Sequence, residues 1–324
     1  MKIAIVGATG LVGRKMLEII LQKNLTEAKN ITLFASENSE GKIVEVLNNK
    51  FVVHKLQGAK IGQYNFALFC AGGAVSKKYS PKFAKKGAYV IDNSSAFRRK
   101  KNVPLVVPEI NFAQIKEKNK LIANPNCSTI GASLVLFAIS KKYEISRVIV
   151  STYQACSGAG QKGICDLQNS TTEKFPYPIA SNLIPHIDYP LKNQYTFEED
   201  KMNYELKKIL CNKKLKISAT CVRVPVENCH SEAITIEFFK RPNINKIKKL
   251  LKEMPSVVLY DDLKTLKYPM PQLADGKAEV FVGRIRRDVS NPKAIVLFIS
   301  FDNILKGASL NAVQILEKLI QNQK

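Results

Sequence analysis

The sequence predicts an α/β protein in which a Rossmann-type, doubly wound parallel sheet is followed by a second domain of α+β type. An apolar run at residues 2–6 leads directly into the glycine turn GATGLVG. Strand-like and helix-like segments then alternate, which is typical of a parallel sheet. From residue 145 onward, β-branched strand patterns outnumber helical ones, which favours an α+β arrangement for the rest of the chain.

Length and composition indicate a two-domain globular protein. The chain has 324 residues, of which 45% are apolar and 24% charged, enough for two hydrophobic cores. No apolar run approaches the ~20 residues that span a membrane, and MKIAIVGATG is too short an apolar stretch for a signal peptide. The seven cysteines lack paired spacing, and neither CxxC nor HExxH occurs. We therefore expect a cytoplasmic protein with reduced thiols, no metal site and no membrane partner.

The net charge of +23 raises the question of nucleic-acid binding. The excess is mostly lysine and is scattered along the chain, in pairs such as Lys77-Lys78 and Lys213-Lys214. No known nucleic-acid-binding motif accompanies these pairs. We interpret them as solvated helix faces and turns that attract small anionic substrates, and we expect no nucleic-acid partner.

The glycine turn is the first candidate site. A strand, a glycine turn and a periodic helix at residues 11–21 form the phosphate-binding element of a dinucleotide fold, where glycines let backbone N–H groups approach a pyrophosphate. The spacing here is GxxGxxG, and a β-turn-α unit that binds no cofactor is the alternative. We assign the turn to a cofactor through Gly7, Thr9, Gly10, Leu11, Val12 and Gly13.

The ends of the next strands supply further candidates. ITLFAS ends at Ser36, where an acid usually binds the ribose hydroxyls of NAD. A serine hydroxyl can instead bind the 2′-phosphate of NADP, whereas the neighbouring Glu37 favours NAD. YNFALFCAGG ends at Gly72-Gly73, which we also assign to the cofactor, ahead of a predicted helix at 76–86. AYVIDNSSAFR presents Arg98, whose planar fork suits phosphate or carboxylate.

Cys127 is the candidate nucleophile. It follows the turn Asn124-Pro125-Asn126 and precedes the apolar run 130–139, which reads as a buried helix. The N-terminus of a helix favours an anion, so a thiol at this position is shifted toward the nucleophilic thiolate. The alternative is a small apolar cysteine that merely packs the start of the helix.

Three histidines could exchange a proton with such a thiolate. His54 lies in the alternating strand FVVHKL, and His186 lies in the proline-flanked loop NLIPHID. His230 belongs to two predicted strands around a turn near residues 227–228, where it follows Arg223 on what we expect to be an adjacent strand. An anion-binding group and a base would then lie close together, so we favour His230.

A dinucleotide turn, an activated cysteine, a histidine and anion-binding side chains predict an aldehyde or acyl-phosphate oxidoreductase that works through a thioester. The alternative from another class is a basic Rossmann-fold binding protein without catalysis. Unchanged function after Cys127→Ala would favour binding, and complete loss would favour the enzyme.

The chain also resembles the aspartate-β-semialdehyde dehydrogenase family nearly end to end. The resemblance is carried, in order, by GATGLVG, AGGAVS, VIDNSSAFR, VPLVVPEIN, NPNCST, YQACSGAG, NLIPHID, RVPVENCHSE and EVFVGRIRRD. It implies a dinucleotide-binding domain at residues 1–126 and 307–324, which includes a C-terminal helix. Residues 127–306 would form the catalytic and dimerisation domain.

The resemblance implies a role for each matching side chain. Catalysis is implied for the nucleophile Cys127, the general acid/base His230 and the orienting Gln154. Substrate binding is implied for Arg223 at the α-carboxylate, Glu198 at the ammonium group, Arg98 and Lys201 at the phosphate, and Asn126. Backbone donors around residues 126–127 would stabilise the oxyanion. Further cofactor contacts are assigned to Ser36, Ser157, Gly158 and Asn303.

The reaction implied is the NADP-dependent reductive dephosphorylation of L-aspartyl-4-phosphate to L-aspartate 4-semialdehyde, a step toward lysine, threonine and methionine. A homodimer is expected, with a tetramer as the alternative, and the sequence does not bear on allosteric control. N-acetyl-γ-glutamyl-phosphate reductase shares the fold and the thioester chemistry. Its acetylated substrate needs no ammonium-binding acid, so Glu198 favours the aspartate enzyme.

Two departures from the family pattern bear on these expectations. The family often carries an arginine within ASxRSAGK that binds the 2′-phosphate, but this chain reads ASENSEGK, with Asn38 and Glu40. NAD is therefore retained as an alternative cofactor to NADP. Cys156 stands where valine is common, and we interpret it as a valine-sized core residue rather than an oxidisable second thiol.

Overall fold

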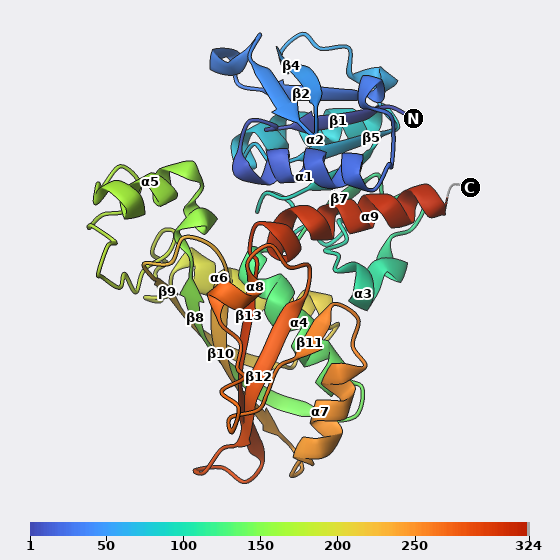
Figure 1. Ribbon diagram of the computed structural model, residues 1–324. Coiled ribbons are helices and arrows are strands. Elements are labelled where there is room, and N and C mark those ends of the chain that lie inside the picture. Colours follow the sequence, from blue (N-terminus) through green and yellow to red (C-terminus); the bar gives the residue numbers. More distant parts are fainter. Residues whose placement is uncertain (323–324) are drawn as a thin grey trace. The chain divides into compact units, whose positions relative to one another are not determined.

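The computed structural model of the protein describes residues 1–322 and divides into two compact units (Figure 1). One unit comprises Met1–Pro125 and the C-terminal segment that starts at Ala308, and the other comprises Asn126–Gly307. These boundaries lie within one residue of those proposed from the sequence. Each unit contains its own sheet. None of the helices within residues 1–322 has both the length and the apolar character needed to cross a membrane.

The first unit contains a seven-stranded sheet in the order β3-β4-β2-β1-β5-β6-β7. Neighbouring strands are parallel except β3 and β4, which pair antiparallel at one edge. This confirms the predicted parallel sheet, in which ligands bind beyond the carboxyl ends of the strands. The strands are β1 (Ile3–Val6), β2 (Ile31–Ala35), β3 (Ile43–Val46), β4 (Asn49–Lys55), β5 (Phe66–Phe69), β6 (Tyr89–Asp92) and β7 (Leu121–Ala123).

The helices predicted for this unit are present. α1 follows the glycine turn, and α9 near the C-terminus packs against it. α2 begins at Gly73, earlier than the predicted start at Ser76, because Gly72 adopts φ +87° and turns the chain directly into the helix. The helices are α1 (Leu11–Gln22), α2 (Gly73–Lys85), α3 (Pro108–Asn111) and α9 (Leu310–Gln321), with short turns η1 (Ala28–Asn30), η2 (Glu37–Ser39), η3 (Ile61–Gln63) and η4 (Phe112–Gln114).

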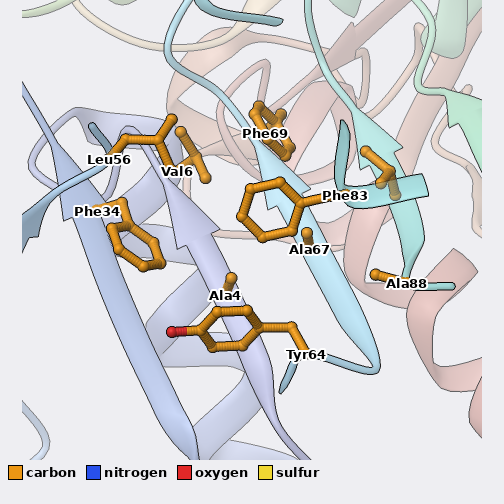
Figure 2. Close-up of a cluster of buried hydrophobic side chains, with 10 residues drawn as sticks. Ala4, Val6, Phe34, Leu56, Tyr64, Ala67, Phe69, Phe83 and Ala88 are labelled. Carbon is orange, nitrogen blue, oxygen red and sulfur yellow. The ribbon is translucent and has the colours of Figure 1, made fainter. Parts of the chain in front are cut away.

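A cluster of buried side chains packs α2 onto the parallel strands (Figure 2). Phe83 of α2 lies edge-on to Phe69 of β5, with ring centroids 5.4 Å apart. The ring of Tyr64 also packs on the ring of Phe83, with centroids 5.9 Å apart, and Val6 of β1 belongs to the same cluster. Burying a large apolar side chain contributes about 1.5–3 kcal/mol. The cluster therefore holds α2 firmly against the strand ends at which a cofactor would bind.

Two glycines bring α1 close to β1. A Cβ atom on Gly13 would overlap the carbonyl oxygen of Gly7 and lie 2.8 Å from the Cα of Ala8. Gly7 itself has φ +91°, which side chains other than glycine rarely adopt. Glycine is therefore required at both positions, at Gly7 by this φ and at Gly13 because the backbones of α1 and of the turn after β1 lie too close together for a side chain, as they do in dinucleotide-binding turns.

The second unit contains a six-stranded mixed sheet in the order β11-β12-β13-β10-β8-β9. This confirms the predicted α+β class, but β8 lies between β9 and β10. The expectation that Arg223 and His230 occupy adjacent strands is therefore wrong, because the connection after β9 crosses over β8. The strands are β8 (Ile145–Gln154), β9 (Lys216–Arg223), β10 (His230–Phe238), β11 (Val257–Leu259), β12 (Val280–Arg287) and β13 (Ala294–Phe301).

Helices α4, α6 and α7 pack on one face of this sheet. Along β8, Val148, Val150, Thr152 and Gln154 are buried, whereas Tyr153 between them is 39% exposed, as the alternation of a strand requires. α4 is buried almost all round. The helical segments are α4 (Cys127–Ser140), η5 (Cys156–Ala159), α5 (Gln161–Asn169), α6 (Phe197–Ile209), α7 (Ile244–Lys252), α8 (Pro271–Ala274) and the π-helical turn η6 (Leu305–Ser309).

Candidate active site

Cys127 lies at the N-terminus of α4. It is the first residue of the helix, and Asn126 precedes it as the N-cap with an extended backbone. The carbonyl oxygen of Asn126 accepts the first helical hydrogen bond, from the N–H of Ile130 at 3.1 Å. The predicted placement of Cys127 in the first turn is confirmed. At this position the positive end of the helix dipole stabilises a thiolate.

His230, the first residue of β10, faces the sulfur. Its Nε2 lies 3.2 Å from the Sγ of Cys127. The ring is fully buried and edge-on to Phe301, with centroids 6.1 Å apart. The backbone N–H of Ala155 donates to Nδ1 at 3.1 Å. Because Nδ1 is an acceptor, the hydrogen-bond network assigns the proton of the neutral ring to Nε2, which donates it toward the sulfur.

The surroundings keep His230 uncharged. Burial, followed by the positive charge of Arg223, lowers the pKa of His230 to about 3, against a smaller opposing effect of Glu198. The imidazole is therefore neutral throughout the range in which a histidine normally titrates. In the resting site it is therefore a neutral hydrogen-bond partner of the sulfur rather than the cationic half of an ion pair.

The depressed pKa of His230 predicts the pH dependence of thiol reactivity. A folded-state pKa of about 3 leaves His230 neutral above that value, so of this pair only the thiol can change charge above it. Alkylation of Cys127 by iodoacetamide, followed by peptide mass spectrometry, should rise with pH in one step. A second inflection near pH 6.5 that disappears in His230→Asn would contradict this expectation.

Glu198, in the first turn of α6, organises the polar side chains around the cysteine. Its Oε1 accepts from Asn126 Nδ2 at 2.7 Å and from Gln154 Nε2 at 3.0 Å. Its Oε2 forms an ion pair with Lys201 Nζ at 2.6 Å. Burial raises the pKa of Glu198, but the charge of Lys201 and these hydrogen bonds outweigh it and lower the pKa to about 2. Glu198 is therefore a buried carboxylate that already holds an ammonium group.

Lys201 spans two carboxylates. Besides Glu198, its Nζ contacts Oδ2 of Asp188 at 3.0 Å, in a loop before α6. The N-terminus of α6 is fixed by a capping box in which Thr196 and Glu199 bond each other's backbone N–H groups. This cap aligns the first turn, so that Glu198 and Lys201 share one face of the helix.

Arg223, the last residue of β9, is 5% exposed and lies beside His230 despite the strand between them. A Cβ atom on Gly158 would lie 2.9 Å from Arg223 Nη1 and 3.0 Å from His230 Cε1. Nη1 donates to the carbonyl oxygen of Ala155 at 2.6 Å, and the guanidinium stands over the ring of Phe175. Nε has no hydrogen-bond partner within the described residues. A buried guanidinium with a spare donor suits a carboxylate ligand.

Two of the residues assigned to the cofactor lie together in this unit. Asn303 Nδ2 donates to Ser157 Oγ at 3.0 Å, and Asn303 Oδ1 accepts the backbone N–H of Cys229 at 2.9 Å. Ser157 lies in η5, next to Gly158. The pair thus connects the loop after β8 to the residue that precedes His230.

Apart from Gly158, the other assigned cofactor residues lie in the first unit, which contains a cavity of about 440 Å³ lined by some of them. One wall is formed by the glycine turn and the end of β2, and the other is apolar, with Leu56, Val75 and Tyr79. Leu11, Val12 and Gly13 form the start of α1, and Gly72-Gly73 form the start of α2. Glycines at a helix start beside an apolar slot fit a dinucleotide. The residues of the first wall include Gly7, Thr9, Gly10, Ser36 and Glu37.

Arg98 also belongs to the first unit, in the segment after β6. It is largely buried, and its Nη2 donates to the carbonyl oxygen of Asn93 at 2.6 Å. His54 is exposed on β4, and His186 is exposed in a loop. The second unit therefore brings together most of the predicted catalytic and substrate-binding side chains, whereas Arg98 and the glycine turn are parts of the first.

Some functional contacts were not predicted from the sequence. Ala155 orients both His230 and Arg223 through its backbone N–H and carbonyl groups, which leave no sequence signal. Glu205 accepts the backbone N–H of Asn126 at 2.7 Å. The Asn126 N–H is therefore not available as an oxyanion donor, and the expectation for the other backbone donors around residues 126–127 stays a prediction. The spacing of Glu198 and Glu205, two acids on one helix face, was the signal that could have identified this contact.

Cys156 is a core residue in the structure. Its side chain is fully buried with Phe175, Ile179 and Ile184. Burial raises the pKa of this thiol, against a smaller opposing effect of Arg223. Both observations support the interpretation as a valine-sized core residue.

One group of side chains within residues 1–322 has the proximity of metal ligands: Cys229, Asp275 and Asp302 lie within 4.8 Å of one another. The backbone N–H groups of Ile304 and Leu305 donate to one oxygen of Asp302, at 2.9 and 2.8 Å. The other oxygen accepts from Gly276 at 3.1 Å. These hydrogen bonds indicate that Asp302 stabilises the turns at residues 276 and 304–305.

Comparisons with known proteins agree with this architecture. Residues 2–118 match the family model "Semialdehyde dehydrogenase, NAD binding domain", and residues 136–306 match "Semialdehyde dehydrogenase, dimerisation domain". Aspartate-semialdehyde dehydrogenases of Aquifex aeolicus and Bacillus subtilis are 46% and 45% identical, over 99% and 98% of this chain and 98% and 96% of theirs. The crystal structure of aspartate semialdehyde dehydrogenase II from Vibrio cholerae, complexed with ASA, superimposes with a TM-score of 0.95 at 38% identity, covering 100% of this chain and 99% of that one.

The fold and site therefore define a two-domain, NAD(P)-binding oxidoreductase of the semialdehyde dehydrogenase class. Its full-length similarity to the named relatives narrows this further. The chain belongs to the aspartate-semialdehyde dehydrogenase family, which confirms the resemblance stated from the sequence.

Proposed function

We propose that the protein catalyses the NADP-dependent reductive dephosphorylation of L-aspartyl-4-phosphate to L-aspartate 4-semialdehyde, through a thioester on Cys127. The observation that carries this proposal is the 3.2 Å approach of His230 Nε2 to Cys127 Sγ at the start of α4. The buried guanidinium of Arg223 and the buried carboxylate of Glu198 lie near Cys127 and His230, and they suit the carboxylate and the ammonium group of an amino acid. The product would feed lysine, threonine and methionine synthesis.

Substrate binding follows from the charges around the cysteine. Arg223 would hold the α-carboxylate through its Nε side, because Nε has no hydrogen-bond partner among the described residues and Nη1 is bonded to the carbonyl oxygen of Ala155. Glu198 would hold the α-ammonium group, and Gln154, which donates to Glu198, would orient the acyl group. Lys201 and Arg98 would bind the phosphate.

In the chemical steps, the thiolate of Cys127 attacks the acyl carbon, a C–S bond forms, and inorganic phosphate leaves. Reduction of the thioester gives a thiohemiacetal, and cleavage of its C–S bond releases the aldehyde and restores the thiolate. A bound nicotinamide supplies the hydride for this reduction. His230 Nε2–H, directed at the sulfur, would hydrogen-bond the oxygen that develops on the adjacent carbon and stabilise its negative charge, and this oxyanion expels the thiolate without a net proton transfer.

The test is a phosphorolytic assay with purified protein, aspartate semialdehyde, phosphate and NADP, followed by the absorbance of the reduced nicotinamide. Turnover that requires all three reactants supports the proposal. Folded protein without turnover on either nicotinamide would overturn it. The acetylated glutamate semialdehyde would then be the next substrate, because the reductase for that compound shares the thioester chemistry.

Glu37 bears on the choice of cofactor. Its carboxylate belongs to the wall of the dinucleotide cavity, where it would oppose the 2′-phosphate of NADP and accept the ribose hydroxyl of NAD. We expect measurable use of NAD and, in Glu37→Gln, about tenfold tighter binding of 2′-phospho-ADP-ribose, because removing one like charge is worth about 1 kcal/mol or more. Calorimetry with this fragment and with ADP-ribose measures the effect without turnover.

The matched control for Glu37 is Glu40→Gln. Glu40 pairs with Lys55 at 3.3 Å and is not among the residues of the cavity wall, so its replacement should leave the preference between the two fragments unchanged. Equal preferences in Glu37→Gln and in the unmodified protein would show that Glu37 does not select the cofactor.

A homodimer through the open face of the second sheet completes the proposal. Tyr153 of β8 is 39% exposed there and packs on Phe298 of β13 at 6.1 Å. Tyrosine is enriched at protein–protein interfaces, and the family model of this unit is named for dimerisation. Sedimentation should give twice the chain mass, and Tyr153→Asp should give the monomer. A tetramer mass would indicate a second interface, and a monomeric unmodified protein would exclude the dimer.

A cytoplasmic location is the remaining part of the proposal. All seven cysteines, which lie within the described residues, are present as thiols, and a thiolate nucleophile needs a reducing compartment. Fractionation of cells with an antibody to the protein would test it, and recovery outside the cytoplasm would refute it.

A further inference from the structure

Two buried carboxylates of α6 hold the residue that precedes Cys127. Glu198 and Glu205 are seven residues apart, two helical turns, and therefore lie on one face of the helix. Glu198 Oε1 accepts from the side-chain Nδ2 of Asn126 at 2.7 Å. Glu205 Oε2 accepts from the backbone N–H of Asn126 at the same distance. The first contact belongs to the proposed substrate site, whereas Glu205 has no role in the proposed substrate binding or chemical steps.

These contacts fix Asn126 on three sides. Its N–H is bonded to Glu205, its side-chain amide to Glu198, and its carbonyl oxygen to the N–H of Ile130. A hydrogen bond to a charged acceptor is roughly twice as strong as one between neutral groups, and Glu205 is only 1% exposed. The backbone torsions of Asn126 set the direction in which the Cα–Cβ bond of Cys127 points.

We infer that Glu205 is a positioning residue for the nucleophile: by holding the N–H of Asn126, it directs the sulfur of Cys127 at Nε2 of His230. Gly307 packs against the cysteine, since a Cβ atom added at Gly307 would lie 3.1 Å from the Cβ of Cys127. The side chain therefore has little room to adjust if Asn126 moves. The effect of Glu205 on turnover rests on the proposed function, but its effect on the reactivity of the Cys127 thiol does not.

A purely structural role for Glu205 would be to anchor α6 against α4. Glu199 provides the matched control, because it is a glutamate of the same helix that also accepts backbone N–H groups. Its partners are Thr196 at 2.8 Å and Cys221 at 3.1 Å, away from the nucleophile. Loss of either glutamate should lower stability, and only loss of Glu205 should change the thiol.

The experiment compares Glu205→Ala, Glu205→Gln and Glu199→Ala in the full chain. Three quantities are measured: urea unfolding, the pH profile of Cys127 alkylation by iodoacetamide, and kcat with KM. In Glu205→Ala we expect slower alkylation at neutral pH with a midpoint at higher pH. We also expect kcat to fall on the order of 100-fold, with KM within about threefold, because misplacement of reacting groups by ~1 Å costs about that much.

The other variants separate the two roles. Glu205→Gln keeps an acceptor oxygen and should recover most of kcat, whereas Glu199→Ala should lose stability while the pH profile of Cys127 alkylation stays that of the unmodified protein. If Glu205→Ala does not fold, Glu205→Asp replaces it, since the shorter carboxylate keeps the charge but not the reach. A folded Ala or Asp variant with an unchanged or faster alkylation profile would overturn the inference. Absence of turnover in the unmodified protein would bear on the proposed function alone.

Discussion

Replacing Cys127 by serine is expected to abolish turnover, by a factor on the order of 10⁴ or more, as removal of a covalent nucleophile generally does. The hydroxyl fits the space of the thiol and would keep its place 3.2 Å from His230. A serine hydroxyl does not ionise at neutral pH, however, and His230 cannot accept its proton, because the Nε2 atom that faces residue 127 already carries the ring proton. Urea unfolding should be nearly unchanged.

The loss is measured in the phosphorolytic assay and by intact mass. The unmodified protein, given aspartate semialdehyde and NADP without phosphate, should acquire the mass of an acyl group, and Cys127→Ser should not. Cys211→Ser is the control, because Cys211 is exposed at the end of α6 and its replacement should leave turnover intact. Retention of more than about a tenth of the activity in Cys127→Ser would exclude the thioester mechanism.

Gly158→Ala is expected to lower kcat/KM about 100-fold, although it adds only one methyl group. The new Cβ would lie 2.9 Å from Arg223 Nη1 and 3.0 Å from His230 Cε1. Neither Arg223 nor His230 can move away easily, because both side chains are hydrogen-bonded to the backbone of Ala155. The arginine should be displaced most, so we expect KM for aspartate semialdehyde to rise more than kcat falls.

Gly62→Ala is the control for this change. A Cβ there would meet only the Lys86 side chain, at 3.8 Å, so stability and turnover should stay within a factor of about two. Gly158→Ala should cost about 1–3 kcal/mol of unfolding free energy, as overpacking usually does. A folded Gly158→Ala variant with unchanged kcat/KM would show that Arg223 and His230 tolerate a wider separation than their packing indicates.

The sequence alone determined the features that depend on local pattern. The glycine turn, the helix after it and the position of Cys127 in the first turn of α4 all follow from residue type and spacing over a few neighbours. The class of each sheet follows from the alternation of strand and helix signals. Cys127 and His230 could also be named from residue type and position, whereas Gln154, Glu198 and Lys201 could be named only because a family resemblance supplied roles that no local pattern contains.

Only the tertiary structure decided which groups meet. Arg223 and His230 come together across β8, which local pattern could not predict, because strand order depends on pairings between distant segments. The tautomer of His230 depends on a backbone N–H of Ala155, and the pKa of about 3 depends on burial and on the charge of Arg223. The use of the Asn126 N–H by Glu205 depends on how α6 packs against α4. Hydrogen bonds to backbone and desolvation arise only when the chain is packed, so their effects cannot be read from the identities of the residues.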